Sequence, residues 1–218
     1  MAEFAGVFDI HLTVRLTTAC LSGTAGESAA ERLRGWAGAN GAKFTHIVLD
    51  RGGEPSRPML TLAGRGTLTE QRATADGTAR RLRAAGFEVA RVKIEAAPWN
   101  ADVPGTARAA AALPGCYFEH HAKVLVTGGP PALARLAELA VPHAAHVSRN
   151  ARRHRDDGAH ERFVTQRCRG FGLPEARGRF DALLAGLAGG GFAVLESEQE
   201  FVVHDDNPAI DDGWIEER

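Results

Sequence analysis

The sequence is poor in cysteine and in aromatic residues, and it has no long apolar run. Its three cysteines are an odd number without a CxxC spacing, which argues against a disulfide framework and a thiolate zinc site. No apolar run approaches the roughly 18 residues of a membrane span, and the start lacks the pattern of a signal peptide. We therefore expect a soluble, cytoplasmic protein without a membrane partner.

Neither sign of charge dominates, since 26 Lys and Arg stand against 27 Asp and Glu. A balanced chain creates no strong field toward nucleic acid or anionic lipid, so we expect neither as a partner. The segment 149–155 is basic and the tail 205–217 is acidic. A solvated hairpin is the favoured interpretation of 149–155, with a phosphate-binding arm or a flap over a site as alternatives.

Period-2 alternation and helical spacing predict the same order of elements twice. In the first half, Thr24–Glu27 predicts a helix-capping box. The expected elements there are strands 8–14, 44–49, 59–63 and 87–95 and helices 24–36 and 69–85. After an Ala-, Pro- and Gly-rich linker at 98–114, we expect strands 117–126, 144–148, 163–167 and 192–203 and helices 130–140 and 174–187.

Matched residues support an internal duplication. Phe8 and His11 have counterparts 110 residues later, Thr61 and Arg65-Gly66 have counterparts 104 residues later, and His46 aligns with His146. The expected fold is α/β (α+β), an internally duplicated βαββαβ chain of tandem ferredoxin-like repeats with antiparallel sheets. The repeats span 1–104 and 115–218, the second with an acidic extension, and form one compact unit. The sequence leaves open whether the sheets pair side by side or face to face.

Strand alternation separates a helix-covered face from an open face. If the apolar residues of each strand face the helices, His11 and His121 lie on the open face of the first strand of each half. The same alternation places there three cationic or acidic residues of 87–95 (Arg91, Lys93, Glu95) and three glutamates of the last strand (Glu196, Glu198, Glu200).

The four repeat-related histidines are the candidate catalytic residues: His11, His121, His46 and His146. Histidine can move protons near neutral pH, and nearby hydroxyls and cations can hold an anion. The candidate ligand-binding residues are Thr13, Lys123, Arg65, Arg169, Lys93 and Thr165. Each Arg-Gly pair precedes an expected helix start, where backbone N–H groups favour an anion, although the glycines also suit a plain turn. The alternative is a set of ordinary polar residues on an exposed face.

A second interpretation of the same face is a divalent metal site. His121, a second histidine and one glutamate (Glu119, Glu196 or Glu198) would supply the two-histidine, one-carboxylate ligand set of open catalytic sites. No HExxH spacing is present. The cofactor therefore stays open between none and a divalent metal.

His11-Leu-Thr13 and His146-Val-Ser148 each have the form His-x-Thr/Ser. They resemble the paired motifs of the 2H phosphoesterases, in which two histidines serve as acid or base and the hydroxyls bind a phosphate. The resemblance covers these six residues. The repeat partner of the first motif is His121-Ala-Lys123, which lacks the hydroxyl, so the sequence does not place the chain in that family.

The leading hypothesis is an enzyme or ligand-binding protein for a small anionic, perhaps phosphorylated, compound. If it is an enzyme, hydrolase or phosphoester-type acid–base chemistry is expected. A metal-dependent enzyme and a non-enzymatic module that contacts another macromolecule are the alternatives. The sequence is compatible with a homo-oligomer.

Overall fold

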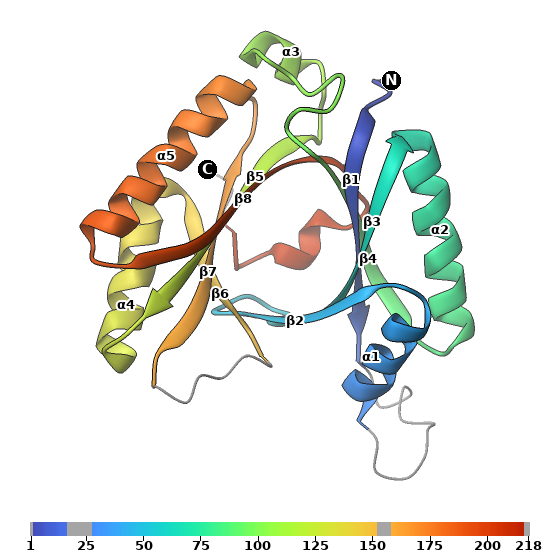
Figure 1. The fold of residues 1–218 in the computed structure, drawn as a ribbon, viewed down its shortest axis with the longest axis horizontal. Helices are drawn as coiled ribbons and strands as arrows, with labels where there is room; N and C mark the ends of the chain where they lie inside the picture. Colours follow the sequence, from blue (N-terminus) through green and yellow to red (C-terminus); the bar gives the residue numbers. More distant parts are fainter. Residues whose placement is uncertain (1, 17–27, 152–157, 216–218) are drawn as a thin grey trace.

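Eight strands form the framework of the computed structural model, which describes residues 2–16, 28–151 and 158–215. The strands are β1 (Ala5–Arg15), β2 (Lys43–Leu49), β3 (Ser56–Thr67), β4 (Glu88–Ala96), β5 (Tyr117–Val126), β6 (Ala145–Asn150), β7 (His160–Cys168) and β8 (Ala193–Asp205). Every neighbouring pair is antiparallel. The order β1-β3-β2-β6-β7-β5-β8-β4 returns to β1, so the sheet closes into a barrel (Figure 1).

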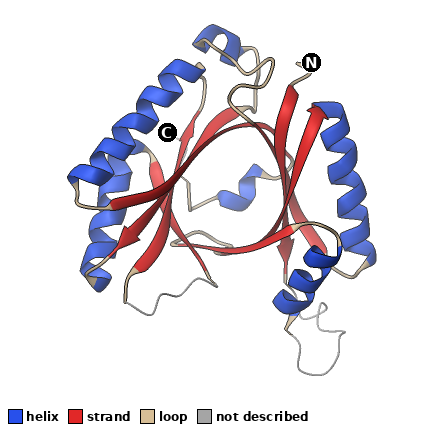
Figure 2. Cartoon of the chain, in the orientation of Figure 1, coloured by secondary structure: helices blue, strands red, loops and turns tan. Residues whose placement is uncertain are grey.

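Five α-helices are present in the described residues: α1 (Ala29–Ala39), α2 (Leu68–Ala84), α3 (Ala107–Ala111), α4 (Gly129–Ala140) and α5 (Leu173–Gly189). Two short 3₁₀ turns, η2 (Val141–His143) and η3 (Pro208–Asp211), follow α4 and β8. Figure 2 shows the α-helices outside the barrel wall and the short C-terminal turn inside it. No helix in the described ranges combines the length and apolar character that a membrane span requires.

The first half and the second half of the chain contribute adjacent strands. The strands of the first half follow one another around the barrel in the order β4, β1, β3, β2. Those of the second half follow in the order β8, β5, β7, β6, so the fourth, first, third and second strands of each half come in the same order. The halves meet at two seams, β4 with β8 and β2 with β6. The mixed α/β class and the antiparallel pairing predicted from sequence are confirmed.

Local sequence explains where the helices begin. Ser28 accepts a hydrogen bond from the backbone N–H of Glu31 and the Glu31 side chain accepts from that of Ser28, so these residues cap α1. The predicted box at 24–27 lies outside the described residues. Thr67 and Glu70 cap α2 in the same way. The linker predicted at 98–114 contains α3.

The apolar core lies between the barrel wall and the helices, not inside the barrel. One cluster of buried residues joins β1, β3 and β4 to α1 and α2, with Ile10 and Leu82 wholly buried. A second joins β5, β6 and β7 to α4 and α5, with Val124 and Leu183 wholly buried. Because side chains alternate along each strand, the opposite residues point into the barrel. The open face expected from sequence is therefore the barrel interior.

Candidate functional site in the barrel lumen

A cavity of about 250 Å³ lies inside the barrel, and we refer to it as the lumen. Strands of both halves line it with polar and charged side chains, among them His11 and Thr13 from β1 and His121 from β5. A barrel of eight strands has an interior wide enough for side chains and one small ligand. The lumen thus gathers residues that are far apart in sequence.

His11 contacts two other strands. Its Nδ1 lies 2.9 Å from Oγ1 of Thr61 on β3, and its Nε2 lies 2.5 Å from Oε2 of Glu95 on β4. A hydroxyl on Nδ1 fixes the ring orientation, as the partners of catalytic and metal-bound histidines do. His11 therefore presents Nε2 to the lumen carboxylates.

His121 is held in the corresponding way in the second half. Its Nδ1 lies 3.0 Å from Oγ1 of Thr165 on β7. Its Nε2 lies 3.3 Å from Oε1 of Glu119 and 3.6 Å from Oε2 of Glu200 on β8. Both histidines thus contact a threonine hydroxyl at Nδ1 and lie close to carboxylates at Nε2.

Strand register places the two histidine environments at corresponding positions. His11 pairs with Thr61, and His121 pairs with Thr165. Two residues before each histidine is an acid, and that acid pairs with a glutamate: Asp9 with Glu95, and Glu119 with Glu200.

Lys93 connects the two halves inside the lumen. Its Nζ lies 2.5 Å from Glu95 and 2.6 Å from Glu119, and all three side chains are buried. Burial alone would raise the pKa of both carboxyls, but the adjacent ammonium reverses this and holds the pKa of each well below its usual range. The Lys93 pKa is raised in turn, because the two carboxylates outweigh its burial. Glu95 and Glu119 are therefore ionised.

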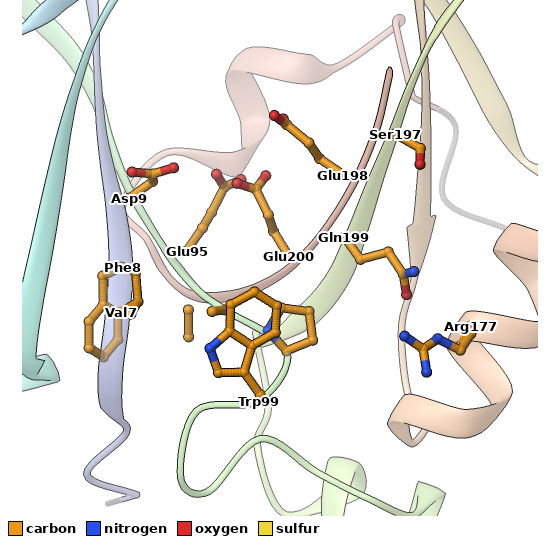
Figure 3. Close-up of a pocket in the computed structure, with 13 residues that line it drawn as sticks. Val7, Phe8, Asp9, Glu95, Trp99, Arg177, Ser197, Glu198, Gln199 and Glu200 are labelled. Carbon is orange, nitrogen blue, oxygen red and sulfur yellow. The ribbon is translucent and has the colours of Figure 1, made fainter. Parts of the chain in front are cut away.

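Glu200 has the opposite protonation tendency. Burial raises its pKa well above the usual range, and the negative charge of Glu95 together with the hydrogen bond between the two carboxyls raises it further. Figure 3 shows the carboxyl groups of Glu95 and Glu200 side by side. Two adjacent carboxyls with opposite shifts are the arrangement expected of an acid–base pair.

The acidic end of the lumen continues into a second cavity of about 440 Å³. Asp9, Glu95, Glu198 and Glu200 line both cavities, and Trp99, 78% exposed, lies over the outer one (Figure 3). Burial raises the pKa of Asp9, to which the charges of Glu95 and Glu198 add. We refer to this opening as the acidic mouth.

The C-terminal segment extends into the barrel (Figure 1). Oδ2 of Asp211 accepts hydrogen bonds from Arg91 at 2.8 Å and from Arg167 at 2.6 Å. Trp214 is buried, lines the lumen and donates from Nε1 to the carbonyl of Val147 at 3.3 Å. Trp214 therefore anchors the C-terminal segment inside the barrel.

The other two candidate histidines lie apart from His11 and His121. His46 contacts Ser56 Oγ at 2.9 Å and does not line the lumen. His146 lies 3.0 Å from Arg51 and packs near the ring of Trp214. Thr61 pairs with Lys43 on β2, whereas Thr165 pairs with His146, so the register does not place His46 and His146 at corresponding positions.

The candidate ligand-binding residues divide between the lumen and its surroundings. Thr13, Thr165 and Lys93 line the lumen. Lys123 is buried and pairs with Glu196 at 3.0 Å and with Glu161 at 3.3 Å, outside the histidine cluster. Glu196 is thus a partner of Lys123.

The two Arg-Gly pairs lie outside the lumen. Arg65 is exposed within β3, and Arg169 stacks on Tyr117 with 4.0 Å from its guanidinium carbon to the ring centroid. The helix N-termini that follow already hold carboxylates, Glu70 at α2 and Glu175 at α5. An anion at either position would compete with these side chains.

Ligand atoms suited to a metal converge twice in the described residues. His11, Glu95 and Glu200 offer atoms within 4.8 Å of one another, and so do Glu95, Glu119 and His121. In the second group the ammonium of Lys93 already binds both carboxylates. In the first group Lys93 binds Glu95 alone, so that group fits a divalent ion better.

Sequence reasoning did not select four residues of this site: Arg57, Thr61, Arg167 and Asp211. Alternation along β3 and β7 would have placed both arginines inward, since each shares its face with a lumen threonine. No periodic signal exists for Asp211, because it lies in a 3₁₀ turn beyond the last strand.

Comparison with known proteins gives no family assignment. No protein-family model matches the chain, and no curated protein matches its sequence.

Proposed function

We propose that the protein is an enzyme that acts on a small anionic molecule in the lumen, with His11 and His121 as acid and base. The proposal depends on two histidines, each oriented by a threonine, that face Glu95 and Glu200. The pKa values of these two glutamates are shifted in opposite directions. Glu200 holds a proton beside the histidines, and ionised Glu95 accepts hydrogen bonds there. Phosphoester or other ester hydrolysis suits such groups.

We also propose that the chain is a tandem pair of ferredoxin-like repeats, 1–104 and 115–218, that form one compact unit. The shared strand order of the two halves supports this, as do the matching His–Thr pairs. The lumen would then be an active site built from equivalent faces of two repeats.

The test is turnover of 4-nitrophenyl phosphate, bis(4-nitrophenyl) phosphate and 4-nitrophenyl acetate across a pH series. General acid–base catalysis predicts that His121→Ala lowers kcat/KM by about 100-fold or more on the ester that is cleaved. His46→Ala is the matched control, because His46 lies outside the lumen. No turnover of any ester, or an equal loss in both variants, would count against the proposal.

A divalent metal at His11, Glu95 and Glu200 is the second candidate, supported by the convergence of their ligand atoms. It predicts about one equivalent of metal in untagged protein purified without chelator, or after incubation with zinc, manganese or iron. His11→Ala should lose that metal and His46→Ala should keep it. Metal-free protein with full turnover would remove this candidate.

A further inference from the structure

Three arginines point into the lumen, and two of them have carboxylate partners. Arg91 donates to Asp205 from Nε at 2.8 Å and from Nη2 at 2.5 Å, and Nη1 donates to Asp211. Arg167 donates from Nε to Glu119 at 2.5 Å and from Nη2 to Asp211. The charge of each is therefore compensated by two carboxylates.

Arg57 on β3 is different. Its only hydrogen bond in the described part of the chain runs from Nη2 to the backbone carbonyl of Ile210, a neutral acceptor. Its Nε and Nη1 are buried and have no hydrogen-bond partner among the described residues. The nearest carboxylate oxygen, Oδ1 of Asp211, lies 3.8 Å from Nη2, beyond hydrogen-bond distance, and Oδ2 of the same group accepts from the other two arginines.

An under-compensated guanidinium at this depth is costly. Arg57 is 6% exposed, and burial lowers its pKa despite the charge of Asp211. A buried donor without an acceptor costs about 1–3 kcal/mol, more when it is charged. A ligand that supplies the acceptor accounts for such a group at a lumen wall.

We propose that Arg57 is the anion subsite of the lumen and receives a carboxylate or phosphoryl group of the ligand at Nε or at Nη1, with the second N–H of Nη2 completing the fork. This inference rests on the proposed function, for which it names one end of the substrate. A guanidinium presents paired donors that match the oxygens of either group.

The position of Arg57 sets the shape of the ligand. Every second residue of β3 faces the lumen, namely Arg57, Met59 and Thr61. Thr61 contacts Nδ1 of His11. Four residues of strand separate Arg57 from Thr61 by about 13 Å. The ligand would thus carry its anionic group at one end and its reacting group roughly 10 Å away, beside the histidines.

The C-terminal segment controls access to this subsite. Nε and Nη1 of Arg57 are covered by neighbouring atoms, and the turn η3 supplies the carbonyl that holds Nη2. An anion reaches these donors when that turn shifts. Trp214, four residues beyond Ile210, is placed to report the shift by its fluorescence.

The experiment is calorimetric titration of the full chain with orthophosphate and, separately, with acetate in low-salt buffer. We expect one of these anions to bind, and Arg57→Gln to weaken its binding by about tenfold or more. Arg65→Gln is the matched control, since Arg65 lies on the same strand but is exposed outside the lumen. The anion that binds tells whether the group is a phosphate or a carboxylate.

No heat of binding up to about 10 mM of either anion, or equal loss in the Arg57 and Arg65 variants, would overturn the subsite. Circular dichroism checks the fold of Arg57→Gln. If that variant is unfolded, Arg57→Lys keeps the charge without the fork and should bind more weakly than wild type. Anion binding that is weakened in Arg57→Gln, in a protein whose wild type turns over none of the esters, would support the subsite while the proposed function failed.

Discussion

The two halves of the barrel share a histidine arrangement but differ in what surrounds it. In both, a lumen histidine is held at Nδ1 by the threonine paired with it, Thr61 or Thr165. Opposite His11 the neighbouring strand carries Lys93, whereas opposite His121 it carries Glu198. On the outer face of the histidine-bearing strands β1 and β5, Ile10 in the first half occupies the position of His120 in the second.

These differences show that each half is incomplete without the other. The first half supplies the cation Lys93, and the second supplies Glu119, one of the two carboxylates that bind it. A buried charge is tolerated only when it is paired. The charge split between the halves therefore joins them across the lumen, and substitutions can test which differences matter.

Removal of Lys93 should have the largest effect. Lys93→Met leaves Glu95 and Glu119 buried without their shared ammonium, so we expect the free energy of unfolding to fall by about 3 to 5 kcal/mol at neutral pH. Urea denaturation followed by circular dichroism measures it. Lys43→Met, which removes an exposed lumen cation, is the control. Equal losses in both variants would show that the link between the halves adds no stability.

His120 should make the free energy of unfolding decrease at acidic pH. It is wholly buried, stacks on Phe180 at 4.7 Å, and its ring nitrogens have no hydrogen-bond partner in the described residues. Burial lowers its pKa from 6.5 to about 4. The unfolded chain therefore takes up the proton first, and stability falls as pH drops through that window, by on the order of 3 kcal/mol.

His120→Ile copies the first half at this position. It should remove that pH-dependent contribution and, by eliminating unsatisfied ring nitrogens, raise the free energy of unfolding at neutral pH by about 1 kcal/mol. Urea titrations of both proteins between neutral pH and pH 4 test this. A variant with the same acid dependence as wild type would show that other groups cause it.

Glu95 and Glu200 occupy related positions yet should respond differently to an uncharged substitute. Glu95→Gln removes the charge that pairs with Lys93 and His11, and we expect a loss of about 2 kcal/mol. Glu200→Gln replaces a protonated acid by an amide of the same shape, so its stability should stay within about 0.5 kcal/mol. Denaturation at neutral pH compares them. A larger loss of unfolding free energy in Glu200→Gln than in Glu95→Gln would show that Glu200, not Glu95, carries the charge.

The last test concerns the feature that the halves share. Thr61→Val and Thr165→Val each remove a hydroxyl bonded to a histidine Nδ1. Each should cost about 1 kcal/mol, and the two costs should be similar. Thermal and urea unfolding measure both. A large difference would mean that only one histidine depends on its threonine.

Much of the fold could be predicted because each strand is half-buried and each helix carries a buried stripe. β5 was predicted at its observed bounds, and the other predicted strands and helices differ from the observed ones at their ends. The short helix α3 was not predicted, because it lies in the segment expected to be a linker. Barrel closure was beyond prediction, since the β2–β6 seam pairs Ile47–Leu49 with residues about 100 positions away and leaves no local pattern.

The site was predictable only where strand alternation determines the face. Alternation placed His11, His121, Lys93 and Glu200 on one face, and they line the lumen together. It could not place Asp211, which depends on how the tail folds back. The helix starts after Arg65 and Arg169 predict anion sites, but the capping glutamates Glu70 and Glu175 already occupy those N-termini.

Closure of the sheet also protects the backbone. An open sheet ends in two strands whose free N–H and C=O groups can recruit a strand from another molecule. Here the order of the described strands returns to its start, so β2 and β4, which would otherwise be edges, are paired with β6 and β8. With only three residue pairs, the β2–β6 seam is the narrowest closure. Its opening would make the chain prone to strand exchange and aggregation.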